Sequence, residues 1–161
     1  MLFYEDIFIA LRKEGIGYVV VGGLAVVLHG VVRLTADLDL IVALEKNNIQ
    51  KFIRVMEKLG YRPKAPVNAL DLADAKKRQI WIHEKNMKTF SFYHRKDQYK
   101  LVDVFVTEPI PFKLLNKNKK MIKAGRIVIP ICSMEHLVKL KKIACRPQDL
   151  ADIAALKKIK K

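Results

Sequence analysis

The chain has 161 residues, 51% of them hydrophobic, and its Lys and Arg residues outnumber Asp and Glu by 31 to 16. A chain of this length buries enough surface to fold without disulfides or a structural metal, and its hydrophobic content excludes a disordered protein. The two cysteines, Cys132 and Cys145, lie in no CxxC or Cys/His pattern, which argues against a zinc site and fits a reducing compartment.

Charge and hydropathy bear on the partners and the location of the protein. A formal charge of +15 attracts polyanions, so nucleic acid is the natural partner and a nucleoside triphosphate a smaller one. The alternative is that the lysines only keep the protein soluble. Glu5 and Asp6 stand where a signal peptide would be positively charged, and the most apolar stretch, residues 19–32, is too short to span a bilayer. We therefore expect a cytoplasmic protein with no membrane partner.

The first sixty residues predict helices and strands in alternation. Gly15 ends an amphipathic pattern, and a fully apolar run leads into Gly22 and Gly23. Asn47 or Asn48 is expected to cap the helix that follows the second strand. The expected elements are, in order, a helix over 3–14, a strand over 18–21, a short helix over 24–29, a strand over 38–42 and a helix over 47–59.

The rest of the chain predicts further strands and then two helices. Ser133 is placed to cap the first tail helix, and Pro147 suits the first turn of the second. Before this tail, the expected elements are a helix over 68–77, strands over 79–83, 89–93 and 101–106, a helix over 112–117 and a strand over 126–131. The last helix is expected to bury a stripe formed by Leu150, Ile153, Ala154 and Leu156.

These elements together predict an α/β (α+β) fold, in which a small mixed β-sheet is flanked by helices and followed by a C-terminal helical pair. We expect residues 1–132 to form the core domain and residues 133–161 to form the helical pair packed on it. Residues 62–86 are the most ambiguous part of the chain, because their apolar residues follow neither the helical period nor the strand period clearly.

Two aspartates, Asp37 and Asp39, open an otherwise apolar predicted strand. Alternation along a strand places both carboxylates on one face and turns Leu38 towards the core. Two carboxylates so close together repel each other unless a cation lies between them. Mg²⁺ takes oxygen ligands and leaves coordination positions for substrate phosphates. The alternative is a pair of solvated aspartates at the edge of the strand.

A third aspartate, Asp103, lies inside the apolar strand predicted over residues 101–106. An isolated buried carboxylate is costly unless it is paired or bound to a cation. A neighbouring strand would bring Asp103 to the same place as Asp37 and Asp39, although a salt bridge to a lysine or arginine is the alternative. Three carboxylates that converge on metal ions suit phosphoryl transfer.

The pair Gly22-Gly23 lies between a predicted strand and a predicted helix. Glycine lets the backbone turn tightly and approach a ligand closely, because no Cβ intervenes. Free amides at the start of the following helix would favour a phosphate group. Taken alone, two glycines more often mark only a turn.

In combination, these residues resemble the nucleotidyltransferase superfamily related to DNA polymerase β, which is marked by Gly-Gly or Gly-Ser, an Asp-x-Asp pair and a later carboxylate. The likeness is closer to AbiEii-type proteins and their small bacterial and archaeal relatives, which often read Gly-Gly-x-Ala and then His-Gly-x-x-Arg-x-Thr-x-Asp-x-Asp. The chain matches with Gly22-Gly23-Leu24-Ala25, His29-Gly30, Arg33, Thr35, Asp37 and Asp39. Its tail is also similar, with Lys141 and then Arg146-Pro147-Gln148-Asp149 and Asp152-Ile153, whereas residues 62–98 are unmatched.

The resemblance implies a nucleotidyltransferase fold and a metal-dependent enzyme. Asp37, Asp39 and Asp103 would be catalytic and would bind Mg²⁺ or Mn²⁺, with Asp103 as metal ligand or general base. Gly22 and Gly23 would hold the triphosphate of the NTP co-substrate.

Three further residues are assigned to nucleotide binding by the same resemblance. They are Thr35, in the matched motif, and Arg33 and Lys141, whose charges would neutralise phosphate. The alternatives are that Arg33 only braces the loop before the strand and that Lys141 is one more exposed lysine. Arg146 and Asp149 are expected to tie the tail helices together.

The acceptor of the nucleotide stays open at the level of sequence. AbiEii-like relatives include toxins of toxin–antitoxin systems, some of which modify tRNA, so the resemblance and the charge favour an RNA acceptor and allow a cognate antitoxin. A small molecule of the antibiotic type, or a protein, is the second possibility. The third is a non-catalytic nucleotide- or RNA-binding protein with the same fold, against which the full set of carboxylates argues.

Overall fold

The computed structural model describes residues 3–160, and residues 1, 2 and 161 lie outside that range. Within it, one mixed sheet has the strand order β3-β4-β5-β2-β1-β7-β6. The strands are β1 (Tyr18–Val21), β2 (Leu38–Val42), β3 (Tyr61–Pro63), β4 (Thr89–His94), β5 (Leu101–Phe105), β6 (Lys120–Ala124) and β7 (Ile127–Ile131). The α-helices are α1 (Glu5–Lys13), α2 (Gly22–Leu28), α3 (Lys46–Lys58), α4 (Ala75–Lys85), α5 (Phe112–Asn118), α6 (Met134–Ala144) and α7 (Pro147–Ile159), with a 3-10 helix at Ala69–Ala73.

The two central strands are short apolar runs that are buried because the sheet extends on both sides of them. β1 pairs with β2 in antiparallel and with β7 in parallel orientation, and β2 pairs with β5 in parallel. Every residue of β1 is buried, as is every residue of β2 except Asp39. The strands predicted over residues 18–21 and 38–42 are therefore confirmed with their boundaries.

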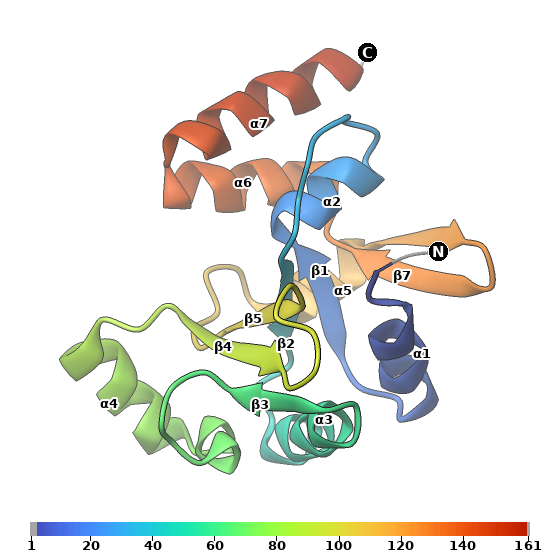
Figure 1. Ribbon diagram of the computed structural model, residues 1–161. Helices are drawn as coiled ribbons and strands as arrows, with labels where there is room; N and C mark the ends of the chain where they lie inside the picture. The colour runs from blue at the N-terminus through green and yellow to red at the C-terminus, as the bar shows by residue number, and fades with distance from the viewer. Residues whose placement is uncertain (1–2, 161) are drawn as a thin grey trace.

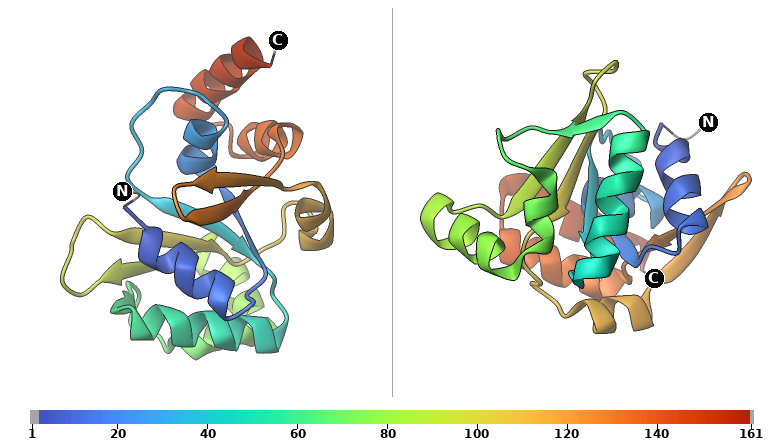
Figure 2. Two further views of the ribbon diagram at one scale, coloured as in Figure 1. Left: turned by 90° about the vertical axis from the view of Figure 1, so that its right-hand side faces the viewer. Right: turned by 90° about the horizontal axis from the view of Figure 1, so that it is seen from below.

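Helices cover one side of the outer strands and leave the other side less covered. α1 and α3 lie side by side, as Figure 2 shows, and α4 lies beside β4. Phe92 of β4 packs against Phe52 of α3, and Phe90 packs against Trp81 of α4. Residues of β4 that alternate with these phenylalanines point to the opposite side, where Ser91 is only half-buried.

At the other end of the molecule, α6 and α7 form the expected helical pair (Figure 1). Ser133 caps α6, since its hydroxyl accepts a hydrogen bond from the amide of His136 at 3.1 Å. α2 contacts both α6 and the central strands, so the pair is joined to the sheet through α2. Within residues 3–160 the structure has no helix that is both long and apolar enough to cross a membrane.

Three local predictions are wrong. The helix expected over residues 68–77 is divided by the extended Asp74 into the 3-10 helix Ala69–Ala73 and the start of α4. The strand expected over residues 79–83 lies inside α4, a helix capped by Asp74, whose Oδ1 accepts hydrogen bonds from the amides of Lys76 and Lys77. Only Trp81 of this helix is buried, so its apolar residues carry no helical period. Neither asparagine caps α3: its first flanking residue is Glu45, and the side chain of Asn48 instead bonds the backbone of Gly17 and Ala43.

Candidate active site

The three predicted carboxylates lie along two neighbouring parallel strands. Asp39 of β2 is the register partner of Asp103 of β5, and Asp37 precedes β2 by one residue. Neighbouring strands are about 4.8 Å apart, and register partners point to the same side of the sheet. Leu38 and Leu40, which alternate with Asp39, are fully buried. The structure therefore brings Asp39 and Asp103 together on the side of the sheet that α3 and α4 do not cover.

This group of carboxylates is short of positive charge. Burial, together with the charges of Asp103 and Asp37, raises the pKa of Asp39 to about 7, while the charges of Arg146 and Lys141 oppose the rise. The pKa of Asp37 is also raised, by burial and by Asp103, with Lys64 acting against it. Oxygen ligands with too little countercharge are the donor set that Mg²⁺ or Mn²⁺ prefers. By their chemistry, these residues fit a divalent cation.

The carboxylates are not arranged as a finished metal site. Among residues 3–160, no three His, Cys, Asp or Glu side chains are placed so that they could hold a metal ion. Asp103 accepts a hydrogen bond from the hydroxyl of Ser91 at 2.5 Å, and the carboxylate of Asp39 lies against Gly22.

The two glycines make room for other side chains of the site. Gly22 has a φ of +68°, and a Cβ at this residue would overlap the carboxylate of Asp39. A Cβ at Gly23 would lie 2.5 Å from Thr35 Oγ1 and 2.9 Å from Arg33 Nη1. α2 begins at Gly22 itself, earlier than expected, so these contacts occur at its first turn. A triphosphate bound here would share this space with Asp39, Thr35 and Arg33.

The two predicted basic residues are both held by carboxylates of α7. Lys141 is only 5% exposed, and its Nζ lies 2.8 Å from Asp152 Oδ2 and 3.3 Å from Asp149 Oδ1. The alternative that Lys141 is an exposed lysine is therefore wrong. Arg33 Nε lies 3.2 Å from Asp152 Oδ1, so Arg33 braces its loop against α7. Asp152 thus joins α6 to the loop between α2 and β2.

The buried face of α7 differs from the expected stripe. Leu150 is 54% exposed and Ala154 is exposed, whereas Asp149 and Asp152 are buried together with Ile153 and Leu156. These four buried residues follow the spacing i, i+3, i+4, i+7, so the period itself was visible in the sequence. Aspartates are seldom buried, so the sequence alone favours the apolar Leu150 and Ala154 for this face. Asp149 also accepts hydrogen bonds from the backbone and the guanidinium of Arg146, which supports the expected structural role of this pair.

A tyrosine near the N-terminus also contributes to the site. Tyr4 Oη lies 2.6 Å from the carbonyl oxygen of Ala36 and 3.3 Å from the amide nitrogen of Leu101. It can donate to the first and accept from the second, which links the residue before Asp37 to the start of β5. Tyr4 is buried, and this burial raises its pKa to about 12. No local pattern in the sequence pointed to this contact.

Comparisons with known proteins agree on the fold. No family model matches the chain, and no curated protein matches it by sequence. The lincosamide antibiotic adenylyltransferase LnuA, in its lincomycin-bound structure, is similar with a TM-score of 0.62 at 18% identity, over 97% of each chain. ANT(2")-Ia, in complex with adenylyl-2"-tobramycin, gives a TM-score of 0.58 at 15% identity, over 94% of this chain and 83% of that one.

A third solved structure is an antigenic nucleotidyltransferase-like protein from Paracoccidioides brasiliensis. Its TM-score is 0.56 at 13% identity, over 94% of this chain and 72% of that one. At such identities a likeness concerns the fold, and residue roles have to be argued from the site itself. The chain therefore has the fold of the nucleotidyltransferase superfamily.

Proposed function

We propose that the protein transfers a nucleotidyl group from a nucleoside triphosphate to an acceptor hydroxyl, with Asp37, Asp39 and Asp103 as its catalytic residues. The observation that carries this proposal is the register pairing of Asp39 with Asp103, with Asp37 two residues from Asp39 and too little countercharge around Asp37 and Asp39. Mg²⁺ or Mn²⁺ held by these carboxylates would supply positive charge to the triphosphate and the departing pyrophosphate.

The reaction forms a bond between the acceptor oxygen and the α-phosphorus and breaks the bond from that phosphorus to the bridging oxygen of pyrophosphate. The proton of the acceptor hydroxyl has to be taken up, and we assign this role to Asp103. The hydroxyl of Ser91 already donates a hydrogen bond to Asp103, which supports the view that this carboxylate can receive a hydroxyl group. Positioning and charge neutralisation account for most of the catalysis of such a transfer.

The residues around the glycine turn are assigned to the triphosphate. Gly22 and Gly23 allow close approach of the backbone, while Thr35 offers a hydroxyl and Arg33 a guanidinium directly beside Gly23. Lys141 is buried behind them and paired with Asp149 and Asp152, so its charge would act on the site through space. The charge of Lys141 lowers the pKa of Asp39, which supports this assignment.

We assign RNA as the acceptor, in the cytoplasm. A net charge of +15 favours a polyanionic acceptor, which a positive field brings to the site faster. A small-molecule acceptor is the second candidate, because LnuA, a lincosamide antibiotic adenylyltransferase, covers 97% of this chain. The toxin role and the cognate antitoxin stay predictions of the AbiEii resemblance.

The test is to incubate the purified protein with Mg²⁺ or Mn²⁺, each α-labelled NTP in turn and total RNA. The matched control is Asp39→Asn, which keeps the shape of the side chain and removes its charge. Label on RNA with the wild type and at least 100-fold less with the variant is the expected result. Transfer only to added small molecules or proteins would show that the acceptor belongs to one of those classes and is not RNA. Absence of both transfer and metal-dependent NTP binding would leave only the non-catalytic alternative.

A further inference from the structure

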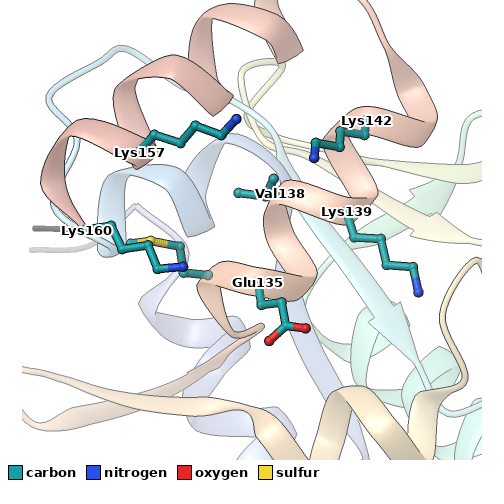
Figure 3. A pocket seen from close by; sticks show the side chains of 7 residues that line it. Glu135, Val138, Lys139, Lys142, Lys157 and Lys160 are labelled. Atoms are coloured by element: carbon teal, nitrogen blue, oxygen red, sulfur yellow. The ribbon is translucent and has the colours of Figure 1, made fainter.

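A cavity of about 290 Å³ lies between the two C-terminal helices, away from the three carboxylates. α6 and α7 meet at Cys145 and Arg146 and diverge from there, as Figure 1 shows. Met134 and Val138 of α6 line the cavity with apolar atoms. Lys142 of α6 and Lys157 of α7 extend towards one another across the gap between the helices (Figure 3). We call this cavity and its lining residues the α6–α7 groove.

The groove is strongly basic, and its charge is not neutralised. Its lining includes four lysines, namely Lys139, Lys142, Lys157 and Lys160, and only one carboxylate, Glu135. None of these four lysines forms an ion pair with a carboxylate of residues 3–160. Lys141, on the opposite face of α6, is in contrast buried and paired twice. The ammonium groups of Lys142 and Lys157 point towards one another and repel, so an anion bound between them is stabilised (Figure 3).

The α6–α7 pair extends from the groove to the candidate active site. Lys139 and Lys142 lie on one face of α6, three residues apart, and Arg146 follows at the turn after the helix. Asp152 of α7 lies 3.2 Å from Arg33 Nε, and Arg33 Nη1 lies beside Gly23, so the helical pair contacts the candidate site directly. α6 has 11 residues and is therefore about 16 Å long, the length of roughly five stacked nucleotides.

The lining of the groove favours a nucleic acid strand over a smaller anion. A cavity of this volume lies at the lower end of small-ligand pockets, so it can take one nucleotide of a strand whose neighbouring phosphates lie outside it. Lysines act as point charges on successive phosphates, and the apolar atoms of Met134 and Val138 suit the ribose and base between them. A free phosphate would use the lysines and leave the apolar lining without a partner.

We infer that the α6–α7 groove binds the backbone of a single-stranded RNA segment and directs its free hydroxyl end towards Asp39 and Asp103. This inference rests on the proposed function, because it takes the acceptor to be RNA. It adds the place where that acceptor binds and the lysines that hold it.

The test measures binding of a 5′-fluorescein-labelled, mixed-sequence 12-nucleotide RNA by fluorescence anisotropy over a series of NaCl concentrations. The groove variant is the double substitution Lys142→Glu with Lys157→Glu. The control variant is Lys46→Glu with Lys58→Glu on α3, two exposed lysines outside the groove, with the same change in net charge. Loss of two phosphate contacts lowers the slope of log K against log [NaCl] by about 1.4. We expect that change, and at least 30-fold weaker binding at 100 mM NaCl, only for the groove variant.

Three results would overturn the inference: equal weakening by both double variants, unchanged binding by the groove variant, or complete competition by tripolyphosphate at the same phosphate concentration. The last would make the groove a general anion site. The proposed function is tested separately, because Asp39→Asn should bind the RNA as the wild type does and yet transfer no nucleotide. The groove variant should keep its thermal stabilisation by Mg²⁺ and NTP, which shows that it is folded.

Discussion

Asp39 and Asp103 face each other as register partners in the parallel ladder between β2 and β5. Each strand is otherwise apolar at its buried positions, so two carboxylates are held about one strand spacing apart at the margin of the core. The rest of the fold explains why they stay there. Tyr4 links the two strands at their start, Gly22 leaves room for Asp39, and Ser91 binds Asp103.

The substitution Asp39→Asn should stabilise the metal-free protein at high pH. The folded protein keeps the proton of Asp39 up to about pH 7, whereas an unfolded aspartate releases it near 3.8, so stability falls as pH rises between these values. The neutral amide removes this loss. At pH 8 we expect the variant to have a free energy of unfolding on the order of 2–4 kcal/mol above the wild type.

Urea denaturation at pH 4.5 and pH 8 checks this prediction, since the advantage should be several times smaller at the lower pH. Added Mg²⁺ should raise the stability of the wild type at pH 8 and leave the variant unchanged. A variant that is less stable than the wild type at pH 8 would show that Asp39 is already compensated by its neighbours.

Gly22→Ala should cost more stability than an alanine at another glycine with the same backbone conformation. Gly22 and Gly125 have φ values of +68° and +61°, but only a Cβ at Gly22 meets another side chain, that of Asp39. Gly125→Ala should cost about 1 kcal/mol for its backbone alone. We expect Gly22→Ala to cost roughly 2 kcal/mol more and to reduce nucleotidyl transfer at least 100-fold. Thermal denaturation of both variants measures the difference, and equal costs would refute the steric role of Gly22.

Lys141→Met should be strongly destabilising, although the new side chain is apolar and of similar length. It leaves Asp152 and Asp149 buried without the ammonium group that lies within 3.3 Å of both. Removal of one partner from a buried ion pair costs about 3–5 kcal/mol, and exposed Lys139→Met should cost under about 0.5 kcal/mol. In a double-mutant cycle with Asp152→Asn, the second substitution should recover part of the loss. Strict additivity would mean that the two residues do not interact.

Tyr4→Phe should loosen the start of both carboxylate-bearing strands. The variant keeps the buried ring and loses the hydroxyl between Ala36 and Leu101, which costs about 1–2 kcal/mol. Tyr99→Phe is the matched control, because Tyr99 is 71% exposed. We expect a lower kcat in the Tyr4 variant with little change in KM for NTP, from steady-state pyrophosphate release. Identical kinetics of the two variants would limit Tyr4 to a role in stability.

The central strands and the carboxylates were predictable because their signals are local. The buried runs Tyr18–Val21 and Leu38–Val42 are uniformly apolar, and Asp39 stands out within the second. β6 was not predicted, because its sequence Lys-Met-Ile-Lys-Ala is that of an exposed edge strand, in which lysines discourage pairing with other chains. Residues 117–123 are mostly polar and show no alternation of apolar and polar residues that would predict a strand.

Contacts between distant segments were beyond prediction. Lysine is usually an exposed residue type, and only the fold places Lys141 between Asp149 and Asp152. Tyr4 forms hydrogen bonds with the backbone of Ala36 and Leu101. Every residue has the same backbone groups, so no sequence pattern identifies these two as its partners. The positions of the catalytic candidates could thus be predicted, and the groups that hold them in place could not.

The double contact of Asp152, with Lys141 in α6 and with Arg33 in the loop after α2, has a consequence for local unfolding. When α7 detaches, the loop loses its ionic anchor at the same moment, so the two segments open as one cooperative unit. Amide hydrogens of α7 would then exchange with solvent at the same rate as the protected amides of the loop, and more slowly in the presence of a ligand bound between them. Access to the glycine turn is in this way coupled to the last helix of the chain.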